Sequence, residues 1–284
     1  GGALGASGVL TLRGSTIADN SAIACGGGVA ADQLEISDTR VLGNLLRGGA
    51  QTIFDLQALQ PQVDKPSGAG IFAKSVKGTR ITVANNRIRL PSSVGRRGLL
   101  TVTNQGGGIR ADSATLVNAT VVGNAGSTGC SFANGDQIYY GPQGLGVYAG
   151  TLSLEHTTLT DPIVAAHLQT HRSLVTGGFN ANPCPLAAGF VPVPQGSVDA
   201  SSYNFYDGEN LSPLGPGDRL VAGTPLLLGA LAENGGAVPT AAPGAGSPLI
   251  DYIPTANCPT LEDARGVVRP QGPGCDVGAV EAAR

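Results

Sequence analysis

Short runs of alternating apolar and polar residues recur along the first part of the chain, and each run ends near an asparagine. One such run places Leu34, Ile36 and Val41 before Asn44. A period of two predicts strands with one buried face. The asparagine of the preceding run is Asn20, so the unit repeats after about 24 residues, a length typical of one coil of a β-solenoid.

A glycine-containing phrase precedes the runs in four copies. Each copy shares a glycine, an aliphatic residue and an alanine: Gly-Gly-Val-Ala-Ala at 27–31, Ala-Gly-Ile-Phe-Ala at 69–73, Gly-Gly-Ile-Arg-Ala at 107–111 and Leu-Gly-Val-Tyr-Ala at 145–149. Stacked coils would place each residue about 4.8 Å from its counterpart in the next coil. This predicts three buried apolar columns: Val29, Ile71, Ile109 and Val147; Ala31, Ala73, Ala111 and Ala149; and Ile17, Val41, Val83, Val121 and Leu159.

Polar residues form columns as well. The predicted columns are an asparagine ladder at a bend (Asn20, Asn44, Asn86, Asn124), an outward threonine row (Thr16, Thr82, Thr120, Thr158) interrupted by Arg40, and outward charges of alternating sign (Asp32, Lys74, Asp112, and Glu35 opposite Lys77). Asparagine tolerates left-handed backbone and its amide bonds both neighbours in a stack, so a structural ladder is expected rather than a ligand site. The charged columns are interpreted as cross-strand ion pairs.

These patterns predict an all-β fold, a right-handed parallel β-helix with three loop insertions on one edge, at 45–67, 87–105 and 126–143. Residues 1–175 would form the coils. Residues 176–284, rich in proline and glycine, would form the terminal coils and an irregular C-terminal cap of the same continuous body. Insertions of this kind are tolerated because the strands stay stacked while loops leave at one corner.

Composition narrows the classes of function. The chain has 44 Gly and 19 Pro, no Met or Trp, and a formal net charge of −3. A coil with a narrow interior and tight corners favours small and β-branched residues. The sequence contains no cluster of basic and aromatic residues, so a nucleic-acid partner is not expected. It contains no run of 18 apolar residues, so no membrane span is expected.

The five cysteines lack the spacing of a zinc site, and no metal or cofactor is predicted. They favour an oxidising compartment. Cys258 and Cys275 flank a loop rich in Pro and Gly, and a disulfide there would contribute about 3 kcal/mol. A second pairing, Cys130 with Cys184, would leave Cys25 free.

Two histidines four residues apart, His167 and His171, would share one face of a helix and could there bind a metal ion. The residues around them instead match the pattern of an earlier coil, with Leu168, Thr170 and Val175 in place of apolar and polar positions of the first run. A sixth coil is therefore predicted here, without a metal site.

The variable outward position within the repeated phrase is the first candidate for binding. It holds Ala30, Phe72, Arg110 and Tyr148 on successive coils. Two aromatic rings flanking a guanidinium are suited to stacking on and hydrogen bonding to a carbohydrate. The alternative is that the neighbouring insertions pack over Phe72 and Tyr148.

Binding residues are often carried on loops that a rigid scaffold positions. The edge from which the three insertions leave is therefore the second candidate. Its most recognition-like segment carries Asp136, Tyr139 and Tyr140.

The last third of the chain carries a specific series of phrases: Leu-Gly-Ala-Leu-Ala-Glu-Asn-Gly-Gly at 228–236, Gly-Ser-Pro-Leu-Ile-Asp at 246–251, Arg-Pro-Gln-Gly at 269–272 and Cys-Asp-Val-Gly-Ala-Val-Glu at 275–281. Together they resemble the bacterial choice-of-anchor Q domain proteins, whose β-helix is of pectate-lyase-like type. The coil phrases are similar to the repeats of polymorphic outer-membrane proteins and autotransporter passengers.

This resemblance covers most of the chain and implies export and surface display through an anchoring segment after the Glu281 region. Asp276 and Glu281 match motif positions of the family. The resemblance implies no catalytic role for either residue, and both are expected to hold the C-terminal cap together. The cap is expected to wrap the last coils through Leu226, Leu227 and Leu228.

Two functions follow as expectations. The first is a secreted or surface-displayed structural or adhesin-like protein without catalysis, which binds glycans, cells or other copies of itself. The alternative is a polysaccharide lyase or glycoside hydrolase acting on an acidic polysaccharide. A lyase needs a base and a cation, for which Arg110, Lys74, Lys77 and Tyr148 are the available groups. A hydrolase needs two carboxylates, for which Asp32 and Asp112 are the available pair.

Overall fold

The structure is a computed structural model. It describes residues 2–23, 25–47, 67–89, 100–126, 129–133, 136–143, 145–177, 196–207, 214–259 and 261–282, with only the backbone for 100–104 and for the strands between 129 and 143. These residues are all-β, apart from one turn of 3-10 helix, η1 (Thr255–Asn257).

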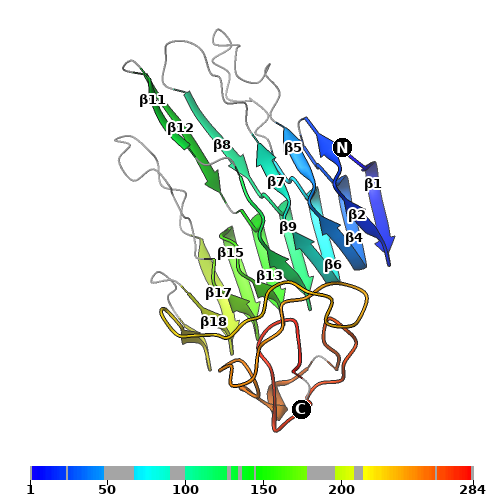
Figure 1. Ribbon diagram of the computed structural model, residues 1–284, viewed down its shortest axis with the longest axis vertical. Coiled ribbons are helices and arrows are strands. Elements are labelled where there is room, and N and C mark those ends of the chain that lie inside the picture. The colour runs from blue at the N-terminus through cyan, green and yellow to red at the C-terminus, as the bar shows by residue number, and fades with distance from the viewer. Residues whose placement is uncertain are drawn as a thin grey trace.

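A large parallel sheet curls around the axis of the molecule (Figure 1). Its long strands pair in order along the axis: β1 (Leu4–Arg13), β4 (Val29–Leu42), β6 (Ile71–Ala84), β9 (Ile109–Val117), β13 (Val147–Glu155), β15 (Ile163–His171) and β17 (Ser197–Ser202). Each coil contributes one such strand, so the neighbours are residues of consecutive coils.

Shorter strands form the next side of each coil: β2 (Thr16–Ala18), β10 (Thr120–Val122), β14 (Thr158–Leu159), β16 (Leu174–Val175), β18 (Phe205–Tyr206) and β19 (Arg219–Leu220). β4 and β6 are long enough to belong to both sides. The third side of the coils is a separate parallel sheet, called the third sheet below. It consists of β3 (Ser21–Ala22), β5 (Leu45–Arg47) and β7 (Arg87–Arg89). The predicted parallel β-helix is confirmed, and its right-handed winding stays a prediction.

The three predicted apolar columns are in register and buried. In the first column, Val29, Ile71, Ile109 and Val147 pair successively and are fully inaccessible to solvent. The alanine column and the column from Ile17 to Leu159 are buried in the same core cluster. Burying apolar surface contributes about 25 cal/mol per Å², so these columns supply most of the stabilisation of the coil.

The glycines of the repeated phrase allow two layers to approach closely. A Cβ added to Gly70 would lie 2.6 Å from the carbonyl oxygen of Gly108 and 2.9 Å from Nδ2 of Asn86. Gly68, which begins the same turn, has a φ of 66° that side chains rarely adopt. The phrase therefore marks the place where the backbone packs against the asparagine ladder.

The asparagine ladder is a continuous row of hydrogen bonds. Asn44 donates from its backbone N and its Nδ2 to Oδ1 of Asn86, at 3.0 and 2.9 Å, and Asn86 donates in the same way to Asn124. Each amide also donates to a backbone carbonyl of the preceding coil, as Asn86 does to Val41. The buried amides of the ladder are thus hydrogen-bonded while the register of the coils is fixed, which confirms the structural interpretation.

The ladder ends on an aspartate that the repeat pattern did not predict. Asp161 Oδ2 accepts from the backbone N and the Nδ2 of Asn124, both at 2.8 Å, and Oδ1 accepts from Gly123. At another corner Asn204 donates in the same way to Asp218. A carboxylate only accepts hydrogen bonds, so aspartate suits the terminal position of a row in which every amide donates forward.

The boundaries of the insertions differ from those predicted. Residues 45–47 and 87–89 are coil strands β5 and β7. Within the later insertions, β8 (Leu100–Gln105), β11 (Gly129–Ala133) and β12 (Asp136–Gln143) form a small sheet in which β12 is the middle strand. Strands of three residues show too little alternation to be recognised in the sequence.

The C-terminal segment, residues 214–282, packs on the last coils: Leu226 and Leu228 contact a core cluster that contains Phe205 and Leu249. The prediction was wrong for Leu227, which is exposed to solvent. The segment also returns along the side of the β-helix (Figure 1), where Glu233 forms an ion pair with Arg40. This return was not predicted. It covers the threonine row, which was expected to point outward to solvent.

Three members of that row, Thr82, Thr120 and Thr158, are buried. Thr82 donates to the carbonyl of Pro239, and Thr158 accepts a hydrogen bond from the backbone N of Ala279 at 3.0 Å. Two of the three hydroxyl groups therefore bind the C-terminal segment, and the burial of all three rules out a free threonine surface on these coils.

Buried charges hold the end of the segment together. Arg269 and Glu281 form an ion pair at 2.9 Å with both side chains inaccessible or nearly so. Asp263 accepts from the backbone N of Arg265 and of Glu281. The predicted Cys258–Cys275 disulfide is present, with β20 (Ile253–Pro254) antiparallel to β21 (Gly274–Cys275), and Cys25 is a free thiol.

We expect Asn86→Ala to lower the free energy of unfolding by about 3 kcal/mol or more. The substitution removes the acceptor of Asn44 and the donor to Val41, and each buried polar group left without a partner costs about 1–3 kcal/mol. Urea unfolding measures the loss. Asn20→Ala is the matched control because Asn20 is the partly exposed outer end of the row; an equal loss in both variants would contradict a role for the ladder.

Candidate functional site

The predicted outward column is a real surface feature. Phe72, Arg110 and Tyr148 are in register on β6, β9 and β13, and all three side chains are half-buried. Ala30 precedes them in the column and Val164, which is buried, follows. The three residues are thus brought together, partly open to solvent and partly supported by their surroundings.

The arginine of this column is fixed on two sides. Its guanidinium carbon lies 5.3 Å from the centroid of the Tyr148 ring, and Nη1 donates to Asp112 Oδ1 at 3.0 Å. A cation over an aromatic face is attracted by the ring's quadrupole. The column therefore presents a held guanidinium between two rings, which can stack on a sugar and hydrogen bond to its hydroxyls.

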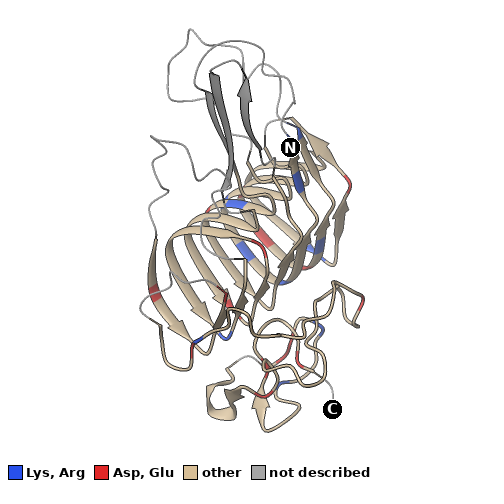
Figure 2. Ribbon diagram, turned by 60° about the vertical axis from the view of Figure 1, so that its left-hand side comes forward, with Lys and Arg blue, Asp and Glu red and all other residues tan. Residues whose placement is uncertain are grey.

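The groups considered for lyase or hydrolase chemistry are engaged in ion pairs. Figure 2 shows basic and acidic positions on neighbouring coils of the β-helix. Lys74 Nζ lies 2.8 Å from Asp32, and Lys77 lies 3.8 Å from Glu35. The hydrogen bond from Lys74 lowers the pKa of Asp32, and the same bond raises the pKa of Lys74. The Lys74–Asp32 pair thus stays charged near neutral pH, whereas a general acid or base must change its protonation state.

A serine, a histidine and an aspartate meet at the edge of β15 and β17, which the sequence did not reveal because they come from separate strands. Nδ1 of His167 lies 3.1 Å from Asp199 Oδ2 and 3.3 Å from Ser197 Oγ. In a catalytic triad the serine and the acid bind opposite ring nitrogens. Here both contact the same nitrogen, and Ser197 donates to Asp199, so the serine is not activated.

His171 lies four residues further along β15, and its Nδ1 shares a hydrogen bond of 2.9 Å with Oγ of Ser202. Both histidines are therefore on a strand, as predicted, and each is hydrogen-bonded to a residue of β17. Among the described residues, no group of three or more metal-ligating side chains is close enough to hold a metal ion.

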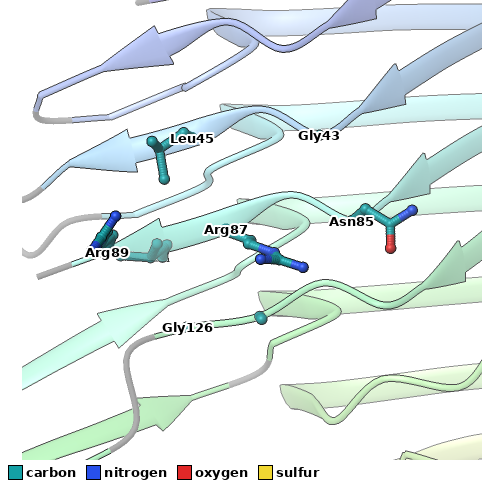
Figure 3. Close-up of a pocket in the computed structure, with 8 residues that line it drawn as sticks. Gly43, Leu45, Asn85, Arg87, Arg89 and Gly126 are labelled. Atoms are coloured by element: carbon teal, nitrogen blue, oxygen red, sulfur yellow. The ribbon is translucent and has the colours of Figure 1, made fainter.

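A pocket of about 650 Å³ lies over the third sheet (Figure 3). Arg87 and Arg89 project from β7 into this region, beside Leu45 of the preceding coil. The walls are completed by Gly43, Asn85, Ile88, Ala125 and Gly126. The sequence analysis assigned residues 87–105 to an insertion and so placed both arginines in a loop. For this reason it did not predict the pocket.

The other predicted site residues lie partly outside the description. Asp136, Tyr139 and Tyr140 belong to β12, the middle strand of the small sheet, rather than to a loop tip. Their side chains are outside the described residues, as is Cys184 of the second predicted disulfide.

Comparison with known protein families, with curated proteins and with solved structures finds no match to this chain. Helices long and apolar enough to cross a membrane are absent from the part of the chain that the structure describes. The site is therefore interpreted from its own geometry.

A histidine and an aspartate with strongly shifted pKa values lie where the C-terminal segment meets the coils. Burial, together with the charges of Arg269 and Arg172, lowers the pKa of His156 to about 2. Burial raises the pKa of Asp276 to about 6. His156 is completely buried, and its Nε2 lies 3.7 Å from Glu155.

The two shifts act on stability in opposite directions. Below pH 6.5, His156 becomes protonated in the unfolded chain but stays neutral in the folded protein. The free energy of unfolding therefore falls as the pH decreases. Between pH 6 and about 4 the folded Asp276 binds a proton that the unfolded chain does not, so the free energy rises. Each slope is about 1.4 kcal/mol per pH unit, and they offset one another in that interval.

We therefore expect His156→Gln to gain stability relative to the wild type on acidification from pH 6.5 to 4.5, by about 1 kcal/mol or more per pH unit. Asp276→Asn should show the reverse trend, because the histidine slope is then uncompensated. Urea unfolding at several pH values measures both slopes. Parallel pH profiles for the wild type and His156→Gln would show that the histidine is protonated in the folded state.

Proposed function

We propose that this chain is a non-catalytic β-helix protein that binds glycans. The observation that carries the proposal is the held Arg110 guanidinium between Phe72 and Tyr148. Flat aromatic faces stack on the apolar face of a sugar ring, and a fixed guanidinium supplies directed hydrogen-bond donors. Because neighbouring coils bear the three side chains, their spacing is set by the rigid sheet.

The pairing of acids with bases supports a binding role over a catalytic one. Asp112, one carboxylate of the hydrolase alternative, binds Arg110, and Asp32, the other, binds Lys74. A retaining or inverting hydrolase needs one carboxyl group that is protonated and one that is free. These two carboxylates instead neutralise the cations beside them.

The proposal extends to the setting in which the protein acts. The C-terminal phrases resemble those of choice-of-anchor Q domain proteins, and we propose a secreted or bacterial cell-surface location on that ground. The Cys258–Cys275 disulfide is consistent with an oxidising compartment. Binding to cells or to other copies of the chain belongs to the same proposal.

The test is a glycan array followed by titration of the strongest ligand. We expect Tyr148→Ala to weaken binding by at least about tenfold, because it removes both the stacking face and the partner of Arg110. Tyr148→Phe keeps the ring and should retain most of the affinity. Ala30→Tyr would add a ring in register with Phe72 and should strengthen binding of longer glycans.

Thermal unfolding of each variant separates a binding defect from a folding defect. The proposal fails if no glycan binds, or if Tyr148→Ala binds as tightly as the wild type. Release of reducing ends or of unsaturated products from acidic polysaccharides, lost in Arg110→Ala, would replace it by the enzymatic alternative.

A further inference from the structure

The third sheet carries an unusual concentration of arginines. Arg47 ends β5, and Arg87 and Arg89 begin and end β7; all three are exposed. Arg47 and Arg89 are paired in register on adjacent coils, about 4.8 Å apart along the axis. Arg87 and Arg89 point to the same face, about 6.6 Å apart along the strand.

Like charges directly opposite one another on a sheet are destabilising. Within the described ranges, no carboxylate lies within ion-pair distance of any of the three arginines. Strands β4, β6 and β9 of the main sheet differ in this respect, since every Lys or Arg on them has an acidic partner: Arg40, Lys74, Lys77, Arg80 and Arg110. On these three strands each cation is neutralised by an acid, whereas the described residues offer no acid to the arginines of β5 and β7.

Two of the arginines, Arg87 and Arg89, line the pocket, and Arg47 lies next to Arg89 on the adjacent coil. Leu45 lies beside Arg87, its in-register partner, and gives the pocket an apolar wall together with Ala125. In Figure 3, Arg87 extends over the space between its own coil and the coil of Gly126, while Arg89 stands at the other end of β7. A volume of about 650 Å³ is within the range of small-ligand sites.

We propose that this pocket, lined by Arg87 and Arg89 and extended by Arg47 beside Arg89 on the adjacent coil, binds the anionic groups of an acidic polysaccharide. Guanidinium groups recognise carboxylate and sulfate through paired hydrogen bonds. Three of them, spaced by one coil and by two residues, match a polymer with repeated charges better than a single small anion. The apolar wall at Leu45 suits the carbon face of a sugar ring.

A nucleic-acid ligand is disfavoured by the same geometry. Single strands are bound through grooves that combine a long cationic track with aromatic rings for the bases. The described residues that line the pocket include no aromatic side chain, and the chain has a formal net charge of −3. Binding of an oligonucleotide in place of the polysaccharide would therefore contradict the inference.

The inference rests on the proposed function only for the choice of a carbohydrate ligand, because Phe72, Arg110 and Tyr148 are not part of this pocket. The experiment titrates the protein with oligogalacturonate, dextran sulfate, neutral dextran and inorganic phosphate. The first two arms separate carboxylate from sulfate. We expect binding of at least one acidic polymer that weakens as the ionic strength rises from about 0.05 to about 0.3 M.

Arg87→Gln/Arg89→Gln should weaken that binding by at least about tenfold. The matched control is Arg13→Gln/Lys77→Gln, which removes the same charge from exposed positions elsewhere on the coils. An equal loss in both double variants would show a net-charge effect and overturn the site. So would the absence of binding to both acidic polymers, or complete competition by inorganic phosphate.

Protection of the wild-type protein from an arginine-selective dicarbonyl reagent gives a second readout that requires no variant. The bound polymer should shield Arg87 and Arg89 but not Arg13 in peptide mass spectra, and equal labelling of all three would sink the proposal. Tyr148→Ala tests the two sites separately. Loss of acidic-polymer binding in that variant, with retention in Arg87→Gln/Arg89→Gln, would reject this pocket and keep the proposed function.

Discussion

In-register stacking of the coils is the constraint on which the rest of the structure depends, and the buried asparagine ladder enforces it. A shift of one residue would turn every apolar column outward. It would also separate Asn86 from Asn124, leaving buried amides without partners. The apolar columns would be buried in any alignment of the coils that keeps the period of two. The hydrogen bonds of the asparagine ladder form only in the native alignment and therefore select it. The close approach of Gly70 to Asn86 shows how the repeated phrase serves this requirement.

A one-directional ladder also requires a particular end. Because each amide donates toward the next coil, the last member must accept without donating, which Asp161 does for one row and Asp218 for the other. Burial raises the pKa of Asp161, the cost of placing a carboxyl group in the core. Three donors from the Asn124 turn offset that cost. The coils thus end their polar rows with the one side chain that completes them.

The sequence predicted what repeats and missed what does not. The columns through Val29 and Ala31 could be aligned because four copies share their spacing. β7 was missed because three residues cannot display a period, and Arg87 was therefore placed in a loop. The threonine row was correctly aligned, but its burial depends on a contact between Thr82 and Pro239 over 157 positions of sequence, which no local pattern encodes.

The distribution of charge distinguishes structural from functional positions. On the main sheet, ion pairs such as Arg80 with Asp38, at 2.6 Å, remove the repulsion that identical stacked positions would otherwise create. Exposed pairs of this kind contribute little individually, so their value lies in avoiding like-charge neighbours. A parallel stack amplifies any uncompensated charge because the same position recurs on the next coil. The arginines on β5 and β7 have no acidic partner within the described part of the chain. Their mutual repulsion is a cost that coil stability does not explain, and an anionic ligand is the partner that would remove it.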